Sequence, residues 1–447
     1  MTSGTITAEP PAAGAPPSAG RARWRGYGVA ALFLAPAAFF LIVWIVYPTI
    51  YTMVRSFYGV DGFKQFAGID NYKSIFTTPV LRTAIKNNLI WVAIVPAFVT
   101  AIGLVFAVLI ERISWGVVFK TIVFMPLAIS LFATGVIWRL MDEKDPANGT
   151  INAVVGVFHD EFRPPGVLSN AAPSSAGLAG SAQKGIVLKN PVRPGGTALL
   201  GLTAIPPTDV PAGAKQAVVP ASKPDAVTGV VWRDFKPGGG VPGKVEQGEL
   251  GLPGVSVQLK DSDGKTVGSA TTGSDGSFAF EHLQNASYKV AIGSATFRPA
   301  FGGISWLGPK LITPSIILAY IWVWAGFSMV VIAAGLAAIP RETLEAARTD
   351  GATEWQVFRR VTVPLLAPVL TVVFITMLIN VLKVFDIVLS VAPGSTQSNA
   401  AVIALEMWRY SFGGVNNFGV GSAIAVFLFL LVLPILLVNV RRFRREV

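Results

Sequence analysis

Long apolar runs without charged residues dominate this chain, and short polar segments separate them. A helix needs about 20 apolar residues to cross a hydrocarbon core of roughly 30 Å, because unpaired backbone groups are too costly in lipid for an open structure. Six charge-free runs qualify as spans: 26–54, 87–110, 121–138, 311–340, 361–382 and 410–440, of which the third is short. The pattern therefore predicts a mainly α, polytopic membrane protein with six transmembrane helices.

The stretch 387–405 is apolar at both ends but carries the polar letters PGSTQSN in its middle. We expect an external loop or a re-entrant segment there rather than a seventh span. Residues 1–25 form a tail rich in Pro, Ala, Gly and Ser without an apolar centre, which is typical of disordered chain and not of a cleavable signal.

Lys and Arg are distributed unequally between the two sides of the predicted membrane. One side has Arg21, Arg23, Arg25, Arg112, Lys120, Arg341, Arg348, Arg359, Arg360, Arg441, Arg442, Arg444 and Arg445, and the other has Arg55, Lys64, Lys73, Arg82, Lys86 and Arg409. Because cytoplasmic loops carry the excess of positive charge, both termini are predicted to be cytoplasmic. Spans one to three then occupy 26–141, an extracytoplasmic insertion occupies 142–310, and spans four to six occupy 311–447.

The insertion changes character along its length. Residues 163–224 are rich in Ala, Pro, Gly, Ser and Lys without a sustained period, which predicts linker or weakly structured chain. Residues 225–293 alternate apolar and polar positions, with Asp263-Gly264 and Asp275-Gly276 as tight turns, and predict a small β-sandwich. The stretch 227–292 resembles the B-type repeat domains of bacterial surface proteins. Calcium-binding members carry an acidic cluster where this chain has FKPGGGVPGKVEQGE, so we favour a spacer role over calcium binding.

Composition narrows the chemistry further. Hydrophobic residues make up 52% of the 447 positions and charged residues 14%, and the net charge of +11 comes largely from the clusters beside apolar runs, which is not the pattern of a nucleic-acid-binding protein. The chain has no cysteine and only two histidines, His159 and His282, which lie far apart. This excludes disulfides and thiolate sites and disfavours a metal centre. No catalytic residue, metal site or cofactor is predicted.

A polar segment between spans four and five, residues 341–364, has an amphipathic pattern. Leu344, Ala347, Gly351, Trp355 and Phe358 recur at steps of three or four residues, while several charged residues fall between them. Asp350-Gly351 permits a turn between two short helices. Amphipathicity alone would favour an ordinary helix lying at the membrane surface.

The spacing within this segment is more specific. Glu345, Ala346 and Ala347, then three residues, Gly351, nine residues, and Val361-Thr362-Val363-Pro364 resemble the EAA loop of permease subunits of binding-protein-dependent ABC importers, EAA-x3-G-x9-I-x-L-P. Two Val residues replace Ile and Leu. GIDNYKSIF, NGTIN and WVWAGFSMVVIAAGLAAIP extend the resemblance, which points to maltose-type and α-glucoside permeases and implies the type I permease fold with six core spans.

The resemblance implies a role for the loop. In that family it forms coupling helices in a cleft of the ATP-binding subunit, which here assigns coupling to Glu345, Ala346, Ala347, Asp350, Gly351 and Pro364. It also implies two ATP-binding subunits, a second permease subunit and an extracytoplasmic solute-binding protein as partners, beside membrane lipid. The chain contains no G-x-x-x-x-G-K-[ST] loop, as a separate permease subunit without its own ATPase site would have none.

Polar and aromatic residues near the spans are candidates for a sugar path. Polar side chains in lipid are costly unless they face an interior path or pair with one another, and aromatic faces suit the C–H faces of sugars. The candidates are Trp322, Trp324, Asn380, Lys383, Asp386, Asn416 and Asn417. Lys383 and Asp386 are three residues apart and could simply pair with each other, and the tryptophans could belong to an interfacial belt.

The favoured interpretation is a permease subunit in the bacterial inner membrane that imports a mono- or oligosaccharide by alternating access. An importer of glycerol phosphate or another small polar solute is the first alternative. A membrane-anchored surface protein that displays the β-domain is the alternative from a different class, although an anchor would not need the EAA loop.

Overall fold

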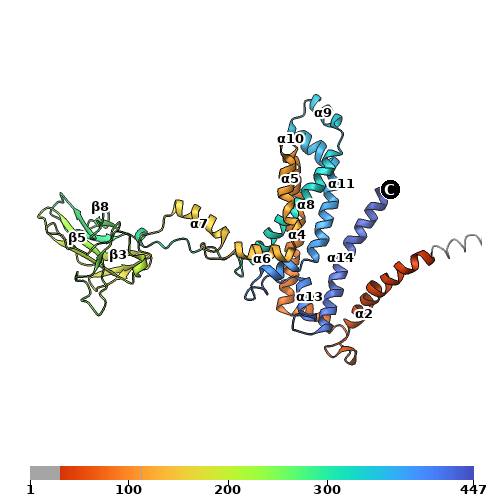
Figure 1. The fold of residues 1–447 in the computed structure, drawn as a ribbon, viewed down its shortest axis with the longest axis horizontal. Helices are drawn as coiled ribbons and strands as arrows, with labels where there is room; N and C mark the ends of the chain where they lie inside the picture. The colour runs from red at the N-terminus through yellow and green to blue at the C-terminus, as the bar shows by residue number, and fades with distance from the viewer. Residues whose placement is uncertain (1–30, 112, 447) are drawn as a thin grey trace, which may run out of the picture. The chain divides into compact units, whose positions relative to one another are not determined.

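The structure is a computed structural model that describes residues 31–111 and 113–446, with side chains up to residue 437. The predicted disordered tail, residues 1–25, lies outside the described residues. The chain forms two compact units, one made of residues up to 136 together with those from 312 onward, and the other made of residues 137–311 (Figure 1). Each unit is described by itself below.

Helices of the first unit follow the apolar runs. The first span covers Ala31–Arg55 and includes a π turn, η1 (Ile42–Val46), and α2 (Tyr47–Arg55). The other elements are η2 (Gly62–Lys64), α3 (Asp70–Thr77), α4 (Pro79–Ile110), α5 (Gly116–Phe124), η3 (Met125–Ala128), α6 (Leu131–Met141), α8 (Ile312–Ala337), α9 (Arg341–Thr349), α10 (Glu354–Val357), η6 (Phe358–Thr362), α11 (Val363–Leu382), α12 (Asp386–Val391), α13 (Ile403–Ser411) and α14 (Phe418–Glu446). Five of these helices are long and apolar enough to cross a membrane.

The predicted third span, 121–138, is not one straight helix. Residues Gly116–Ala128 and Leu131–Met141 form two helical pieces bent by 100° relative to each other, so the described residues contain six spans only if this pair counts as one. Pro126 lies in the 3₁₀ turn that ends the first piece, and Ile129, between the pieces, takes an extended conformation that no helix can contain. The apolar run was continuous, but proline removes a helical hydrogen bond at this point.

The bundle is built around α4 and α8, which pack closely together. Trp91 on α4 meets Tyr320 on α8 in an edge-to-face contact, with ring centroids 5.2 Å apart, and both side chains are buried. Gly103 on α4 lies directly against Ser328 on α8, so the two backbones approach closely. α11 packs against both helices. Small residues at such crossings are typical of helix packing in membranes.

The segment predicted as an external loop or re-entrant segment contains α12 and α13, which are too short to span. Two neighbouring side chains of α4 hold it against the bundle. Asn87 Nδ2 donates hydrogen bonds to the carbonyls of Asn399 and Ala401, at 2.8 and 2.9 Å, and Asn88 Oδ1 accepts one from the Ile403 backbone N–H at 2.8 Å. The loop is therefore fixed through a span that lies some 300 residues earlier in sequence.

The second unit contains a helix and two β-sheets. Its elements are α7 (Thr150–Phe162), β1 (Ala172–Pro173), β2 (Leu178–Ser181), β3 (Gly185–Leu188), β4 (Thr197–Thr203), η4 (Pro207–Asp209), β5 (Val227–Arg233), β6 (Leu250–Gly251), β7 (Ser256–Lys260), β8 (Thr266–Thr271), β9 (Ser277–Phe280), β10 (Lys289–Ile292) and η5 (Ser294–Phe297). One sheet has the order β1-β4-β5-β6, with β9 also paired to β5, and the other has the order β2-β3-β10-β7-β8.

A shared apolar core from both sheets makes this unit a β-sandwich. Val257 and Leu259 from β7 and Val290 and Ile292 from β10 belong to one buried cluster with Leu200 from β4. The predicted alternation in 255–292 is confirmed by this burial. The prediction of linker for 163–224 is wrong, because β1 to β4 lie within it. The segments that join these strands are rich in Ala, Gly, Pro and Ser, and apolar side chains such as Ile186 and Leu200 are buried through pairing with strands further along the chain.

Candidate functional site

The helix–turn–helix at 341–357 is shaped by a specific helix ending. The Gly351 N–H donates to the Arg348 carbonyl at 3.0 Å, and the Ala352 N–H donates to the Ala347 carbonyl at 3.1 Å. These two bonds form a Schellman motif, in which the residue after the helix takes a left-handed conformation. Gly351 has φ +83°, a conformation that glycine adopts without steric cost. The glycine of the EAA spacing thus reverses the chain.

The second helix begins with a capping box. The Thr353 side chain accepts a hydrogen bond from the Gln356 backbone N–H at 3.4 Å, and the Gln356 side chain accepts one from the Thr353 N–H at 2.8 Å. Both otherwise unpaired donors at the start of α10 are thereby satisfied. The letters T-x-x-Q at 353–356 carry the signal for this capping box in the sequence.

An ion pair joins the two helices across the turn. Arg348 Nε lies 2.8 Å from Glu354 Oε1, and Arg348 Nη2 lies 3.4 Å from Glu354 Oε2, so the contact is bidentate. The hydrogen bond and charge of Glu354 raise the pKa of the Arg348 guanidinium further above its usual value. Planar guanidinium and carboxylate groups in this geometry fix orientation as well as distance.

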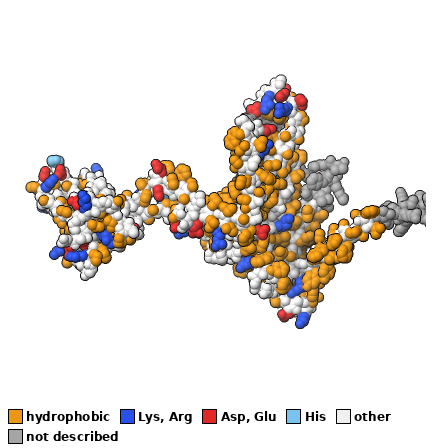
Figure 2. Space-filling model, viewed as in Figure 1, with side chains coloured by type: hydrophobic (Ala, Val, Ile, Leu, Met, Phe, Trp, Pro, Cys, Tyr) orange, Lys and Arg blue, Asp and Glu red, His pale blue; other side chains and the backbone are white. Residues whose placement is uncertain are grey.

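The predicted coupling residues form an open surface. Glu345, Ala346, Asp350, Gly351 and Pro364 are exposed, whereas Ala347 is half-buried. The predicted apolar stripe is not continuous, because Trp355 is 66% exposed and stacks on Phe358, with ring centroids 5.5 Å apart. Charged side chains gather over α9 and α10, while hydrophobic side chains cover the sides of the bundle (Figure 2). This end of the bundle can therefore accept a polar partner.

The loop is connected to a span without a flexible break. α10 continues through the π turn η6 into α11, so that Glu354–Leu382 forms one continuous helical span. Thr362 in the π turn is buried, and Pro364 directly follows the π turn, so the helix continues through the proline. The loop and α11 therefore form one continuous helical element.

The candidate path residues are spread over several elements. Trp322 on α8 is 41% exposed, and Trp324 is half-buried against the rings of Tyr320 and Phe327, at 5.9 and 5.6 Å between centroids. Asn380 is half-buried near the end of α11. Lys383 and Asp386 are both exposed, and the described residues contain no ion pair between them.

Asn417 has a local structural role. Its Oδ1 accepts a hydrogen bond from the Val420 N–H at 3.1 Å, which caps the start of α14. Asn416 beside it is exposed, with φ +52°. The structure does not bring all these candidates together into one site. Among the described residues, no group of three or more His, Asp or Glu side chains is placed to hold a metal ion.

Comparisons with known proteins agree with the features of both units. Residues 278–445 match the family described as binding-protein-dependent transport system inner membrane component, and residues 226–299 match the SdrD B-like domain. The chain is 29% identical over 416 residues to the alpha-glucoside transport system permease protein AglF of Rhizobium meliloti (strain 1021), covering 93% of this chain and 82% of that protein.

Two further matches cover most of the proteins concerned. The chain is 34% identical over 124 residues to the putative ABC transporter permease protein ORF1 of Caldicellulosiruptor sp. (strain Rt8B.4), which spans 28% of this chain and 88% of that relative. In fold it resembles a chain of a bacterial ABC transporter involved in the import of the acidic polysaccharide alginate, with a TM-score of 0.55, 17% identity, and coverage of 95% of this chain and 98% of that one. The chain therefore belongs to the inner-membrane components of binding-protein-dependent transport systems, the permease subunits of ABC importers.

Proposed function

We propose that this permease subunit imports a carbohydrate and is driven by ATP hydrolysis in partner subunits that contact α9 and α10. The name of the α-glucoside permease relative, which aligns with most of this chain, supports a mono- or oligosaccharide as the solute. ATP binding in the partners closes the cytoplasmic side of the bundle and opens the path outward, and hydrolysis resets it.

One observation carries the coupling role. The exposed residues Glu345, Ala346 and Gly351 lie on a helix–turn–helix that is held by a Schellman turn, a capping box and a bidentate ion pair, and that runs without a break into α11. A surface fixed in this way keeps its shape when a partner binds it. Force on the loop then reaches the span instead of being lost in a flexible linker.

The assembly we propose has three kinds of partner. Two ATP-binding subunits bind the cytoplasmic EAA loop, a second permease subunit completes the path, and an extracytoplasmic binding protein delivers the solute. In this proposal both termini are cytoplasmic and the insertion 142–310 is extracytoplasmic, which the excess of Lys and Arg on one side supports. Trp322, Trp324, Asn380, Lys383 and Asp386 remain our candidates for the path, whereas the capping bond of Asn417 makes it the weakest of the set.

Uptake by charge-altered variants tests the coupling role. Gly351→Asp and Glu345→Lys should abolish uptake of a labelled α-glucoside in a strain that lacks the native gene, while the level of the protein in the membrane stays normal. Glu342→Lys is the matched control, because Glu342 is exposed on the same helix but lies outside the EAA spacing. Normal transport by the two EAA variants would contradict the proposal.

Solute competition in the same strain separates the sugar from the alternative class. Excess unlabelled maltose or another α-glucoside should suppress uptake of the labelled sugar. Excess glycerol phosphate should leave it unchanged. Suppression by glycerol phosphate alone would instead favour the importer of a small polar solute.

A further inference from the structure

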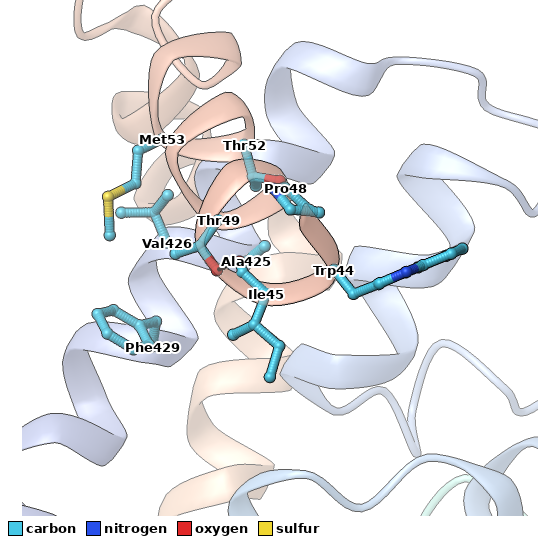
Figure 3. A pocket seen from close by; sticks show the side chains of 9 residues that line it. All are labelled: Trp44, Ile45, Pro48, Thr49, Thr52, Met53, Ala425, Val426 and Phe429. Carbon is cyan, nitrogen blue, oxygen red and sulfur yellow. Dashed lines mark hydrogen bonds between the residues drawn. The ribbon is translucent and has the colours of Figure 1, made fainter. Parts of the chain in front are cut away.

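An apolar hollow lies between the first span and α14. It has a volume of about 330 Å³ and is lined mainly by apolar side chains, among them Trp44, Pro48 and Phe429 (Figure 3). None of the described residues that line it is charged. A face of this kind fits a neighbouring membrane subunit, such as the second permease subunit that we propose as a partner, and selects no ligand of its own. The β-sandwich contains a more specific feature, a buried carboxyl group.

This carboxyl group belongs to Glu249, the residue before β6. The side chain is buried, with 1% of the residue exposed. Its Oε2 accepts a hydrogen bond from the Glu246 backbone N–H at 2.8 Å, but no donor among the described residues bonds its Oε1. A buried carboxylate oxygen without a donor is costly, whereas a protonated carboxyl group can donate a hydrogen bond itself. The surroundings of Glu249 therefore favour its protonated form.

Asp234, at the end of β5, supplies an acceptor for this proton. Its Oδ2 already accepts hydrogen bonds from the Ser174 hydroxyl and from the Gly243 N–H, so this side chain acts as an acceptor. Burial raises the pKa of the Glu249 carboxyl; the Glu246 N–H bond lowers it, but a hydrogen bond with Asp234 and the negative charges of Asp234 and Glu246 raise it further. Two carboxyl groups in contact share one proton, because like charges this close cannot both form without large cost.

Carboxyl groups also hold the loop over this site. Residues 235–248, which we call the cover loop, join β5 to β6 and contain no helix or strand. Besides the two backbone bonds just described, the Val241 N–H donates to Glu246 Oε2 at 2.8 Å, and Lys236 Nζ lies 3.1 Å from Glu246 Oε1. Lys236 and Lys244 are the cations that face Glu246, whereas the described residues pair no cation with Asp234 or Glu249. Closure of the cover loop thus depends on which carboxyl groups are charged.

The cover loop shields an apolar ring of β5. Val245 of the loop packs against Trp232, which is fully buried. The indole Nε1 of Trp232 has no hydrogen-bond partner among the described residues, so the ring is held by packing. Movement of the loop away from β5 would expose this ring to water.

We propose that the proton shared by Glu249 and Asp234 is a switch that keeps the cover loop closed and releases it as the pH rises. When the proton leaves, two negative charges face each other without a paired cation, and opening of the loop lets water separate them. The closed form holds a proton that the open form releases. Closure is therefore complete below the ordinary pKa of a glutamate and is lost as the pH rises through the raised pKa of the closed form.

The switch is independent of the transported solute. In the topology proposed above the sandwich is extracytoplasmic, so the cover loop responds to the pH outside the cell. Only the loop and the side chains beneath it change, because the strands on either side are held by the sandwich core.

Hydrogen exchange of the purified protein tests the switch. Exchange in peptides that cover residues 236–249 is followed by mass spectrometry at pH 5.5 and pH 8.5, and each rate is divided by the intrinsic rate at that pH. We expect the protection of the cover loop to fall about tenfold or more between the two pH values, because opening releases one proton and can gain up to about tenfold per pH unit above the pKa. β7, whose side chains lie in the core, should keep its protection at both.

Two isosteric variants test the two carboxyl groups. Glu249→Gln and Asp234→Asn each keep the size of the side chain and an oxygen acceptor but remove one charge, so the cover loop should stay protected at pH 8.5 in both. Asp263→Asn, at an exposed position in the turn between β7 and β8, is the control and should behave like the wild type.

Three results would overturn the proposal. The first is equal protection of the wild-type cover loop at both pH values. The second is a fall of the same size in Glu249→Gln, which would assign the titration to another group. The third is a parallel loss of protection in β7, which would mean that the whole sandwich unfolds.

Discussion

The shape of the proposed coupling surface depends on the backbone conformation of Gly351. A Cβ atom at this position would meet no other atom within 4 Å, so space does not require glycine there, but φ +83° does. A left-handed residue other than glycine costs roughly 1–2 kcal/mol, asparagine tolerates the conformation best, and a β-branched residue tolerates it worst.

Substitutions at this residue should therefore rank by backbone tolerance and not by size alone. We expect Gly351→Asn to keep most of the solute uptake and Gly351→Val to lose most of it, with equal amounts of both proteins in the membrane. Gly394→Val is the control, because Gly394 also has open space but no left-handed angle. Equal uptake by the Asn and Val variants would show that the turn geometry is not what the partner recognises.

Asp142 is a residue whose stability effect depends on pH. It is 2% exposed, its Oδ2 has no hydrogen-bond partner among the described residues, and burial raises its pKa from 3.8 to about 6. The folded protein thus holds a proton that the unfolded chain releases, so the contribution of Asp142 to stability is fully present below the unfolded pKa and is lost as pH rises through about 6.

Replacing the carboxyl group of Asp142 should remove this loss of stability at high pH. Asp142→Asn should raise the melting temperature of the purified protein at pH 7.5, by an amount equivalent to about 1–2 kcal/mol, and change it little at pH 4. Asp145→Asn, at an exposed position in the same turn region, serves as the control. A stabilisation of the same size at both pH values would mean that the charge of Asp142 is not responsible.

At the scale of elements, the sequence located the helix–turn–helix that we propose as the coupling loop, but not the interactions that hold it. The EAA spacing identified residues 345–364 correctly as a helix–turn–helix, because small residues and glycine occupy diagnostic positions. The pair of Arg348 and Glu354 escaped detection, since a separation of six residues fits no helical period and becomes a contact only after the chain reverses at Gly351. The bend after Pro126 was not predicted either, because a continuous apolar run does not reveal where a helix breaks.

Exchanging the two charges tests whether this ion pair positions α9 against α10. Arg348→Glu and Glu354→Arg should each lower solute uptake, because each places like charges side by side across the turn. The double variant restores opposite charges and should recover uptake, which is measured together with the level of the protein in the membrane. If the double variant stays as poor as the worse single variant, Arg348 or Glu354 contacts the partner directly.

The crossing of α4 and α8 gives a prediction about packing. A Cβ at Gly103 would overlap the Ser328 side chain and come within 2.9 Å of the Met329 backbone nitrogen, which cannot move aside as a flexible side chain would. Gly103→Val should therefore destabilise the protein by about 1–3 kcal/mol, seen as a lower melting temperature in detergent. Ala101→Val, on the exposed face of the same helix, should change it little.

At the scale of the whole molecule, the insertion was predictable in its second half only. Residues 255–292 alternate apolar and polar positions strongly enough to read as strands without knowledge of their partners. Residues 172–203 do not, and their burial arises from pairing across the chain, for example between β4 and β5 and between β3 and β10. Whether such a segment forms a strand depends on its partners as well as on its own sequence.

The two ends of the sandwich lie side by side, which makes its removal feasible. The Gly166 N–H donates to the Arg298 carbonyl at 2.8 Å, and the Leu168 N–H donates to the Thr296 carbonyl at 3.0 Å. Asn152, which is fully buried, joins the segment that leads into the sandwich to the segment that leads out of it. Its side chain bonds the carbonyls of Glu143 and Ile304, the Ile304 N–H and the Trp306 indole.

Replacing residues 167–297 by Asn-Gly should therefore leave a folded permease, because a two-residue turn can close a pair of antiparallel segments at this spacing. We expect normal membrane levels and solute uptake close to wild type, as a spacer role of the sandwich requires. Asn152→Ala should lower the melting temperature in both the full and the shortened chain, since it leaves buried backbone groups unpaired whether or not the sandwich is present. If the shortened chain reaches the membrane at normal levels but no longer transports, the sandwich contributes to capture of the solute or its binding protein, and the spacer role is wrong.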